Sequence, residues 1–582
     1  MVNIVLKQAQ SRSTIAFEGG VQHYHDGNVE PEGSLSLTGQ SGNLNYLISA
    51  SVSSGYKIDD TSELSLHSDL SFNEYISLER EQDTTNYNLS SNLTYDFTER
   101  DRAALNVLYG ENDPPSSLLR EITDFNSAEP VTSFEREIVP ATSTNWEVGG
   151  DYQHSFESGA NYKFLFIVNE KKSDTTRERF EFTTLGGTEE KNLFLDNSSR
   201  YQEKIVRTSY TWRLNADQGM ELGVEAAQTT QDSSLRLGLP LPGESSPLHG
   251  GLVPVFLPNS VSTVEEFRYE GFAVHNWRFN PRMSLESSLV AEFSEIEQTG
   301  DISNKRDFDF LKPKFDFRFD INNSFQMRLS AEKTVSQLRF TDFSAATNAQ
   351  DEDQDIIAGN PELEPEEWWR FILNLDYRLP NDGGVLSSRL FYYDIEGVIG
   401  RIDISRSASE LASTNGNVGN GRVKGLNLDA SIRLGMIGIP QALLTAGLVV
   451  QDQSVEDPMI GGERQVIPFD RGSFRIGFRH DIPRLGLNYG FNYSDRFDGN
   501  RPVYDIDNVT WIGSQSDLTT FVEKTGYLGL TYRLEIINVL DHAFKRERRR
   551  FDGYLRDGIL NEIERFNTTN GARFLLKVRG TF

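Results

Sequence analysis

The stretch that decides the fold is residues 86–97, which read NYNLSSNLTYDF. Tyr87, Leu89, Leu93, Tyr95 and Phe97 take one set of alternate positions, together with Ser91, and Asn, Ser, Thr and Asp take the other. Strict alternation predicts a β-strand with one apolar and one polar face. The same pattern returns in four further segments, which are residues 146–156, 283–293, 315–321 and 325–331. We therefore expect an all-β protein built from two-faced strands.

The connections between these segments alternate between short and long. Short turns are predicted at residues 98–101, 157–160, 215–218, 280–281, 322–323, 380–384 and 481–484. Long polar segments are predicted at residues 110–143, 169–203, 229–264, 336–367 and 400–421. Short turns at one end and long loops at the other are typical of a transmembrane antiparallel β-barrel of the bacterial outer membrane. Counting hairpins predicts about 22 strands, the size class of the plugged transporters.

Composition narrows the class further. The 582 residues contain no cysteine, which argues against a disulfide-stapled fold and against thiolate metal sites. A net charge of −29 disfavours nucleic acid as a partner, while 37 phenylalanines argue against disorder. The chain has no run of roughly 20 apolar residues, so it is not a helical membrane protein.

Three segments carry a family resemblance. Residues 359–366, GNPELEPE, resemble the "GNP-x-L-x-PE" loop of TonB-dependent receptors, with the matching residues Asn360, Pro361, Leu363, Pro365 and Glu366. Residues 421–430 are similar to a strand of that family in which a small residue follows a basic one. Residues 534–541 resemble its near-terminal "v-x-NL-x-D" segment through Asn538 and Asp541. The third match departs from the pattern, because Val539 replaces Leu and the spacing to Asp541 is one residue shorter.

Both ends of the chain fit the resemblance. Near the C-terminus Phe574, Leu576, Val578 and Phe582 alternate up to a final aromatic residue, which resembles the signal read by the barrel assembly machinery. Residues 2–7 resemble the last strand of the family's plug domain. We therefore expect residues 1–10 to be a plug or linker remnant and residues 11–582 to be the barrel. The chain shows no signal peptide after Met1, so we expect a start further upstream or a fragment.

The resemblance implies an outer-membrane receptor of a Gram-negative cell that takes up a scarce nutrient, of the siderophore-iron, cobalamin or glycan class. Its implied partners are the TonB complex, acting through a plug missing here, the barrel assembly machinery and lipopolysaccharide or other outer-membrane lipid. The alternative reading is a plugless passive pore or a structural or adhesive barrel. An assembly or secretion barrel is less favoured, because no periplasmic repeats are found.

We expect neither an enzyme nor a cofactor, because no nucleophile elbow, phosphate loop or metal-binding His motif occurs. His23 and His25 could share a strand face, but two loop-end polar residues are the favoured interpretation. The acidic residues 351–355 could bind calcium, and a solvated loop is again favoured. The basic run 545–550 could contact lipopolysaccharide phosphates, line the lumen or balance nearby acids. Residues 240–258 are rich in Gly and Pro and form a candidate substrate loop.

Overall fold

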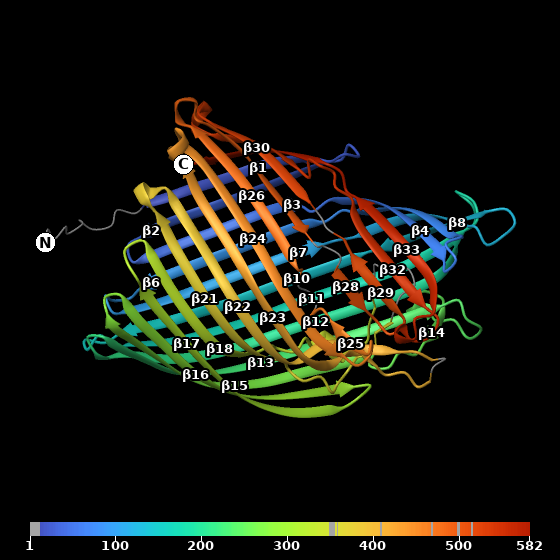
Figure 1. Cartoon of the computed structure of the whole chain (residues 1–582), viewed down its shortest axis with the longest axis horizontal. Coiled ribbons are helices and arrows are strands. Elements are labelled where there is room, and N and C mark those ends of the chain that lie inside the picture. The colour runs from blue at the N-terminus through green and yellow to red at the C-terminus, as the bar shows by residue number, and fades with distance from the viewer. Residues whose placement is uncertain are drawn as a thin grey trace.

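The computed structural model describes residues 12–347, 356–357, 359–407, 410–466, 470–497, 501–513 and 516–582. Within them 22 strands form a closed antiparallel barrel, as the alternation predicts (Figure 1). The barrel closes where β1 (Arg12–His23) pairs with β34 (Arg573–Thr581), with Gly19 opposite Val578. Closure leaves no unpaired edge, which lipid would penalise heavily.

The remaining barrel strands follow in sequence order around the wall. They are β2 (Val29–Ser41), β3 (Leu44–Ser54), β6 (Thr85–Asp96), β7 (Asp101–Asp113), β10 (Ala141–Ser155), β11 (Asn161–Phe182), β12 (Glu190–Asn215), β13 (Gln218–Leu239), β15 (Val261–Asn280), β16 (Met283–Gly300), β17 (Asn304–Asp320), β18 (Phe325–Val335), β21 (Glu367–Leu379), β22 (Gly384–Asp403), β23 (Ser413–Leu434), β24 (Ile439–Asp457), β26 (Gly472–Ile482), β27 (Leu487–Phe497), β30 (Asp517–Thr525) and β31 (Thr531–Ile537).

The apolar face of these strands points out of the barrel. Tyr87, Leu89 and Tyr95 on β6 are 50%, 53% and 43% exposed, and the polar residues between them face the lumen. The same outward exposure holds for Phe293 and Phe315 on β16 and β17. A ring of exposed aromatic and aliphatic side chains is unstable in water and is expected of a wall that faces lipid.

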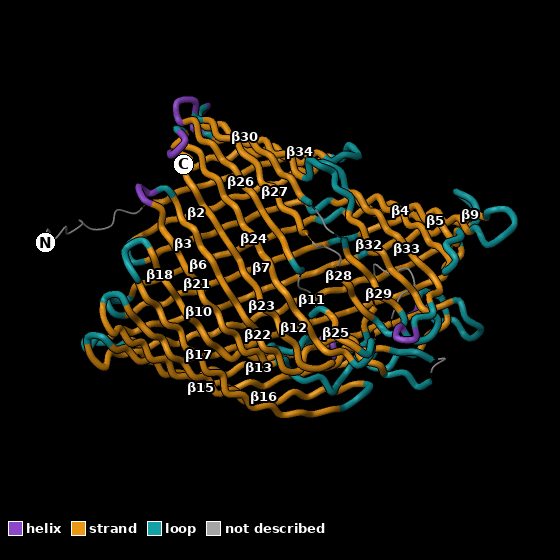
Figure 2. The backbone as a smooth tube through the Cα atoms, viewed as in Figure 1, coloured by secondary structure: helices purple, strands orange, loops and turns teal. Residues whose placement is uncertain are grey.

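The connections define two ends of the barrel, which we call the turn end and the loop end. Short turns close the turn end, and four of them contain the 3-10 segments η3 (Pro380–Asp382), η4 (Gly435–Ile437), η5 (Pro483–Leu485) and η6 (Tyr527–Gly529). Figure 2 shows the loop end as the side with the longer connections, which contain η1 (Pro247–His249), η2 (Phe340–Phe343) and η7 (Leu555–Asp557). No helix in the described part of the chain is long and apolar enough to cross a membrane.

The predicted long polar segments are wrong in one respect, because much of their length is strand. Residues 169–203 lie almost wholly in β11 and β12, which pair from Asn161 opposite Thr211 to Glu181 opposite Glu190. A strand crosses a membrane in about 10 residues, so these 22- and 26-residue strands continue well beyond the lipid. Beyond the lipid both faces of the sheet meet water, so both can carry polar side chains. Without apolar and polar residues in alternation, the sequence does not predict a strand there.

The loop-end connections also build a second sheet, which we call the collar. Its strands are β4 (Lys57–His67), β5 (Phe72–Gln82), β8 (Ser116–Asp124), β9 (Val131–Val139), β28 (Arg501–Tyr504), β29 (Asn508–Ile512), β32 (Phe544–Phe551) and β33 (Leu560–Thr569). They lie side by side in the order β28, β29, β32, β33, β4, β5, β8 and β9, and β9 joins the upper part of β11 (Figure 1). Smaller loop-end strands are β14 (Val253–Val255), β19 (Ala346–Thr347), β20 (Ile356–Ile357) and β25 (Gly462–Arg464).

Candidate functional site

The GNPELEPE segment lies between β18 and β21 and is packed into the wall at the loop end. Leu363 is fully buried. Its apolar neighbours, drawn from β15, β16 and the loop itself, are Val264, Ile296, Leu338, Phe340 and Phe343. Asn360 donates from its side chain to the Asn415 carbonyl at 2.8 Å and from its backbone to the Asp342 carbonyl at 2.8 Å. The segment therefore fastens a long loop to the barrel.

The end of this segment is held in the same way. Glu366 accepts hydrogen bonds from the Ile399 backbone at 2.6 Å and from the Trp368 indole at 3.0 Å, so it joins β21 to β22. Arg306 donates to the Leu363 carbonyl at 3.1 Å. The Pro361 carbonyl accepts from Asn304, and Pro365 leads directly into β21. The five motif residues thus belong to a segment that fastens the loop to the barrel wall, and the contacts named above are all made within the protein.

Asn538 and Asp541 close the base of the last long loop. Both adopt positive φ, at 54° and 43°, which Asn and Asp tolerate better than most residues. Asn538 donates to the Gly571 carbonyl at 3.0 Å, and Asp541 accepts from the Gly571 backbone at 3.0 Å. These bonds hold together the two chain segments that lead into and out of the β32–β33 hairpin.

The C-terminal residues occupy the outer wall. Phe574 and Leu576 are 47% and 51% exposed, whereas Leu575 between them is buried on the inner side. Val578 lies on the same outward face, and the Phe582 ring stacks on Phe17 with centroids 5.9 Å apart. The alternation expected of these residues is present in the structure.

The basic run 545–550 is divided between the two faces of β32. Arg546 and Arg548 point to the inner side of the collar and line a pocket there. Arg549 points to the other face, where it pairs with Glu547 at 2.8 Å and lies over the Trp511 ring. Of the three roles open for this run, lining the interior describes Arg546 and Arg548, and balancing nearby acids describes Arg548, Arg549 and Arg550.

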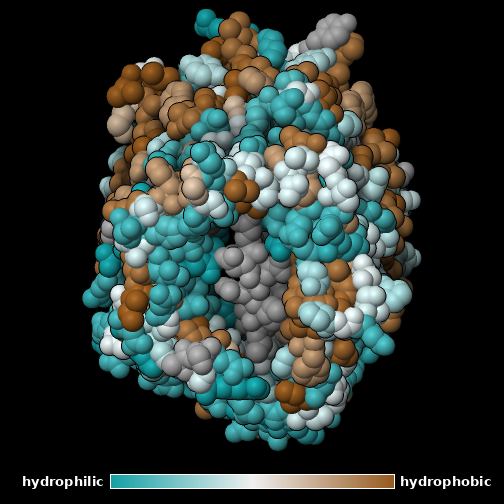
Figure 3. Space-filling view, turned by 90° about the vertical axis from the view of Figure 1, so that its right-hand side faces the viewer, coloured by the Kyte–Doolittle hydropathy of each residue, from teal (hydrophilic) through white to brown (hydrophobic). Residues whose placement is uncertain are grey.

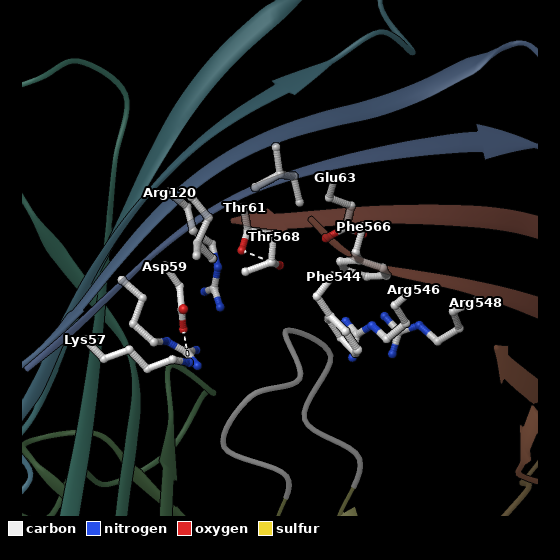
Figure 4. Close-up of a pocket in the computed structure, with 13 residues that line it drawn as sticks. Lys57, Asp59, Thr61, Glu63, Arg120, Phe544, Arg546, Arg548, Phe566 and Thr568 are labelled. Carbon is white, nitrogen blue, oxygen red and sulfur yellow. Dashed lines mark hydrogen bonds and ion pairs between the residues drawn. The ribbon is translucent and has the colours of Figure 1, made fainter. Parts of the chain in front are cut away.

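The pocket is a cavity of about 220 Å³ on the inner face of the collar. It is lined by Lys57, Asp59, Thr61 and Glu63 of β4, Ile76, Leu78 and Arg80 of β5, Arg120 of β8, Phe544, Arg546 and Arg548 of β32, and Phe566 and Thr568 of β33. Figure 4 shows these side chains converging from both sides on a common space. Five cations and two carboxylates contribute to this lining, so its formal charge is positive.

The inner face of the collar continues the inner face of the barrel. Phe164 of β11 lies beside the outward residues Val206 and Val224 and so faces away from the lumen. Arg177 is an odd number of residues further along the same strand, so it points inward. There it meets Glu137 of β9, which in turn contacts Arg120 of the pocket. The pocket therefore opens on the lumen side. Figure 3, which looks onto the loop end, shows hydrophilic side chains around a hollow.

Two buried carboxylates hold the arginines around the pocket. Glu137, 1% exposed, accepts from Arg177 Nε at 2.6 Å and from Arg120 Nη1 at 2.8 Å. On the other side Glu564 accepts from Arg550 Nε at 2.9 Å and also pairs with Arg548. Each carboxylate is shared by two guanidinium groups. Burial opposes ionisation of Glu137, but the hydrogen bond from Arg177 and the two nearby cations hold its pKa below the ordinary value.

Arg80 differs from the other pocket cations. Asp59 lies opposite it in the β4–β5 register but pairs with Lys57 instead. Within the described residues Arg80 has neither a hydrogen bond nor an ion pair. Burial lowers the pKa of Arg80, and the charges of Arg120 and Arg177 lower it further against the opposing charge of Glu137. Burial is therefore the largest cause of the lowered pKa of Arg80, and the neighbouring cations and carboxylates act on it in opposite directions.

Sequence reasoning missed most of this pocket. Lys57, Arg80 and Arg120 lie in three different collar strands, and of these residues Arg120 alone fell in a segment predicted as a long loop. Of the pocket residues, the sequence analysis named as candidates only those in the basic run 545–550. The alternation of Lys57, Asp59, Thr61 and Glu63 was a readable strand signal, but nothing in the sequence reveals that β4 pairs with β33, about 500 residues away.

The candidate metal sites gain no support. Among the described residues no three His, Cys, Asp or Glu side chains form a group that could hold a metal ion. His23 ends β1, and His25 lies in the following turn with Nε2 3.4 Å from Asp60, so the two do not share a strand face. The acidic residues 351–355, like residues 1–10, lie outside the described residues.

Comparison with known proteins places this barrel in a family. Its sequence matches the model described as "TonB dependent receptor-like, beta-barrel" over residues 71–539. No curated protein sequence matches the chain.

Solved structures of the same fold extend over almost the whole chain. The copper transporter OprC is 11% identical with a TM-score of 0.66, and the match covers 99% of this chain and 81% of OprC. The ferric-catecholate import receptor Fiu of E. coli K12 is 11% identical with a TM-score of 0.65, covering 99% and 82%. The ferripyoverdine receptor of Pseudomonas aeruginosa is 12% identical with a TM-score of 0.64, covering 99% and 72%. At these identities the likeness shows the fold alone. The family match covers most of the sequence, and the chain belongs to the TonB-dependent receptors as an outer-membrane β-barrel.

Proposed function

We propose that the chain forms the membrane barrel of a receptor that takes up a scarce small-molecule nutrient, of the siderophore-iron, cobalamin or glycan class, and that it is not an enzyme. One observation carries the proposal. The closed barrel has a polar inner wall that opens, at the loop end, onto the collar pocket. In this family the short turns are periplasmic and the long loops extracellular, so the pocket would meet a ligand before the lumen does.

The inner wall suits the passage of a polar ligand. Charged pairs line it along its length, including Lys312 with Glu270 at 2.9 Å and Arg579 with Glu523 at 2.9 Å. Such pairs keep the wall hydrated while satisfying each charge locally. We propose that residues 1–10 are the end of a plug domain, that residues 11–582 are the barrel, and that the TonB complex acts on the plug to release a captured ligand into the periplasm.

The outer wall suits assembly in the outer membrane. The outward row of Phe574, Leu576 and Val578, ended by Phe582, is what a recognition strand for the barrel assembly machinery would present. The outer face of the collar carries Arg549 and Arg565, and we propose that lipopolysaccharide phosphates meet the protein on that side.

The test is nutrient uptake in the host cell. A strain without this receptor, with and without a plasmid copy, would be grown on an iron-siderophore complex, cobalamin or an oligosaccharide as the limiting nutrient. The proposal expects one class to need the receptor, and expects that uptake to stop when the proton-motive force is dissipated. If uptake continues after the proton-motive force is dissipated, and the purified chain conducts steadily in planar bilayers, the passive pore is supported instead.

A further inference from the structure

The lipid-facing wall carries an apolar groove of about 600 Å³ that crosses strands β21, β22, β23, β24 and β26. Figure 1 shows these strands from outside the barrel. One row of the sheet register runs through the groove, in the order Tyr377, Leu386, Ala430, Ala446 and Ile476. Tyr377 and Ile476 are exposed on the outer face, whereas the side chains of the two alanines between them are short. The groove is therefore a hollow in the surface that meets lipid.

Three turns at the end of this part of the wall are apolar. They contain Met436 and Ile437 between β23 and β24, Leu485 between β26 and β27, and Leu528 between β30 and β31, all of them exposed. Turns of other hairpins at this end are polar, since residues 41–43, 98–100, 157–159 and 322–324 read SGN, TER, ESG and NNS. Exposed apolar side chains are costly in water, and these continue the lipid-facing wall. Lipid is therefore the medium that covers them.

Two cations stand among these turns. Lys524 lies two residues beyond the outward Val522 on β30, so it points to the same face. Its Nζ donates to the Leu485 carbonyl, and it forms no ion pair within the described residues. Arg484, in the same turn as Leu485, is exposed and is likewise without an ion pair there. The turns below the groove carry one carboxylate, Asp382, so two cations oppose a single negative charge.

The distance from these cations to the groove matches the depth of one lipid leaflet. Ile482, at the end of β26, lies in register with Leu487 and through it with Lys524. Ile476, in the groove, is six residues away on the same strand, which is about 20 Å. A strand tilt of about 35–45° reduces this to about 15 Å along the membrane normal. The hydrocarbon core is about 30 Å thick, so the groove lies near its middle when the turns lie at its edge.

A second groove on the outer wall lacks this charge. It has a volume of about 550 Å³ and crosses β11, β12, β13, β15 and β16 around Ala226. The turns below it carry Glu157, Asp217 and Arg282, so two carboxylates oppose one cation. Charge complementarity therefore favours the first groove for an anionic lipid.

We infer that the groove on β21 to β26 holds one acyl chain of an anionic phospholipid from the periplasmic leaflet, with its phosphate at Lys524 and Arg484. Both side chains are donors to phosphate oxygens, lysine as a point charge and arginine through paired N–H groups. The inference goes beyond the proposed function. It requires only that the outer wall stands in lipid, and it does not depend on what passes through the lumen.

The test is lipid binding to the purified full chain, stripped of co-purified lipid in detergent. Native mass spectrometry would count bound molecules during titration with dioleoyl phosphatidylglycerol, with zwitterionic dioleoyl phosphatidylcholine as the comparison. One phosphatidylglycerol should bind at least about fivefold more tightly than phosphatidylcholine, which is the effect of about one cation near an anionic lipid. Lys524→Gln should weaken phosphatidylglycerol binding by about fivefold and leave phosphatidylcholine binding almost unchanged.

Ala446→Leu tests the groove, because the larger side chain would fill it. Each methylene group displaced from an apolar site lowers affinity by about fourfold, so both lipids should bind at least about tenfold more weakly. Ala226→Leu is the matched control, since it makes the same change on the outer face in the second groove. It should leave the tight binding of phosphatidylglycerol unchanged. Both alanines face lipid, and the heat-dependent gel shift of each variant should match that of the parent.

A second measurement locates the lipid in vesicles. Phosphatidylglycerol with a diazirine at the end of its acyl chain should, on illumination, crosslink to β23, β24 and β26 in preference to the rest of the wall. Even labelling around the barrel, equal binding of the two lipids, or equal losses in Ala446→Leu and Ala226→Leu would each overturn the inference. None of these outcomes bears on nutrient uptake, so the proposed function stands or falls separately.

Discussion

Replacing Glu137 with Gln should loosen the collar without opening the barrel. The carboxylate is 1% exposed and lies between Arg177 and Arg120, each of which is also 1% exposed. Glutamine keeps the shape but removes the carboxylate charge that these two guanidinium groups share, and Arg120 keeps its ion pair with Glu135 at 3.0 Å. Breaking a buried ion pair from one side costs about 3–5 kcal/mol, because the remaining charge stays buried without compensation. The barrel wall below should keep its stability, since it closes through β1 and β34.

Hydrogen exchange followed by mass spectrometry is the assay. A loss of about 3–5 kcal/mol corresponds to opening that is about 100-fold to several thousand-fold more frequent in β8 and β9. Glu189→Gln is the matched control, because Glu189 pairs with Arg136 at the surface with both side chains about one-third exposed. That variant should change exchange by less than about fivefold. Equal exchange in the two variants would refute the idea that the buried network holds the collar.

Three further predictions concern the C-terminus, the lipid-facing wall and the collar. Deleting Phe582 should reduce the fraction of protein assembled in the outer membrane, measured by the heat-dependent gel shift of membrane extracts; unchanged assembly would contradict the terminal-signal reading. Leu89→Arg, on the lipid-facing side, should destabilise the folded barrel by about 2–4 kcal/mol in a urea titration in bilayers, whereas the lumen-facing Asn88→Arg should cost much less, and equal losses would contradict the assigned faces. Because the folded-state pKa of Glu137 lies below its ordinary value, its contribution is present above the unfolded pKa of about 4.3 and is lost as pH falls through the folded pKa. Exchange in β9 should therefore rise on acidification below about pH 4, and a flat profile in that range would count against the ion network.

The sequence by itself determined the barrel. Alternation in residues 86–97 predicted both the strand and its faces, because side-chain direction in a strand has a period of two and lipid selects one set. The alternation of short and long connections predicted about 22 strands. Each short turn reverses the chain between two neighbouring antiparallel strands, so counting these hairpins counts the strands. The final alternating residues predicted the outward row of Phe574 and Leu576 for the same reason. The resemblance carried by Asn360 and Glu366 predicted the family, although these residues prove to be structural ties.

Only the tertiary structure decided where the candidate site lies. The collar is made of hairpins that pair across distant parts of the chain, such as Thr61 with Thr568, and such register is set by closure of the whole sheet. The loop-end parts of β11 and β12 were not predicted as strands, because outside the lipid both faces of a strand can be polar. The run 545–550 could not be assigned, since its roles depend on which face of β32 points into the lumen. The pocket exists because closure of the barrel brings β4, β5, β8, β32 and β33 onto one inner face, and no local segment contains that information.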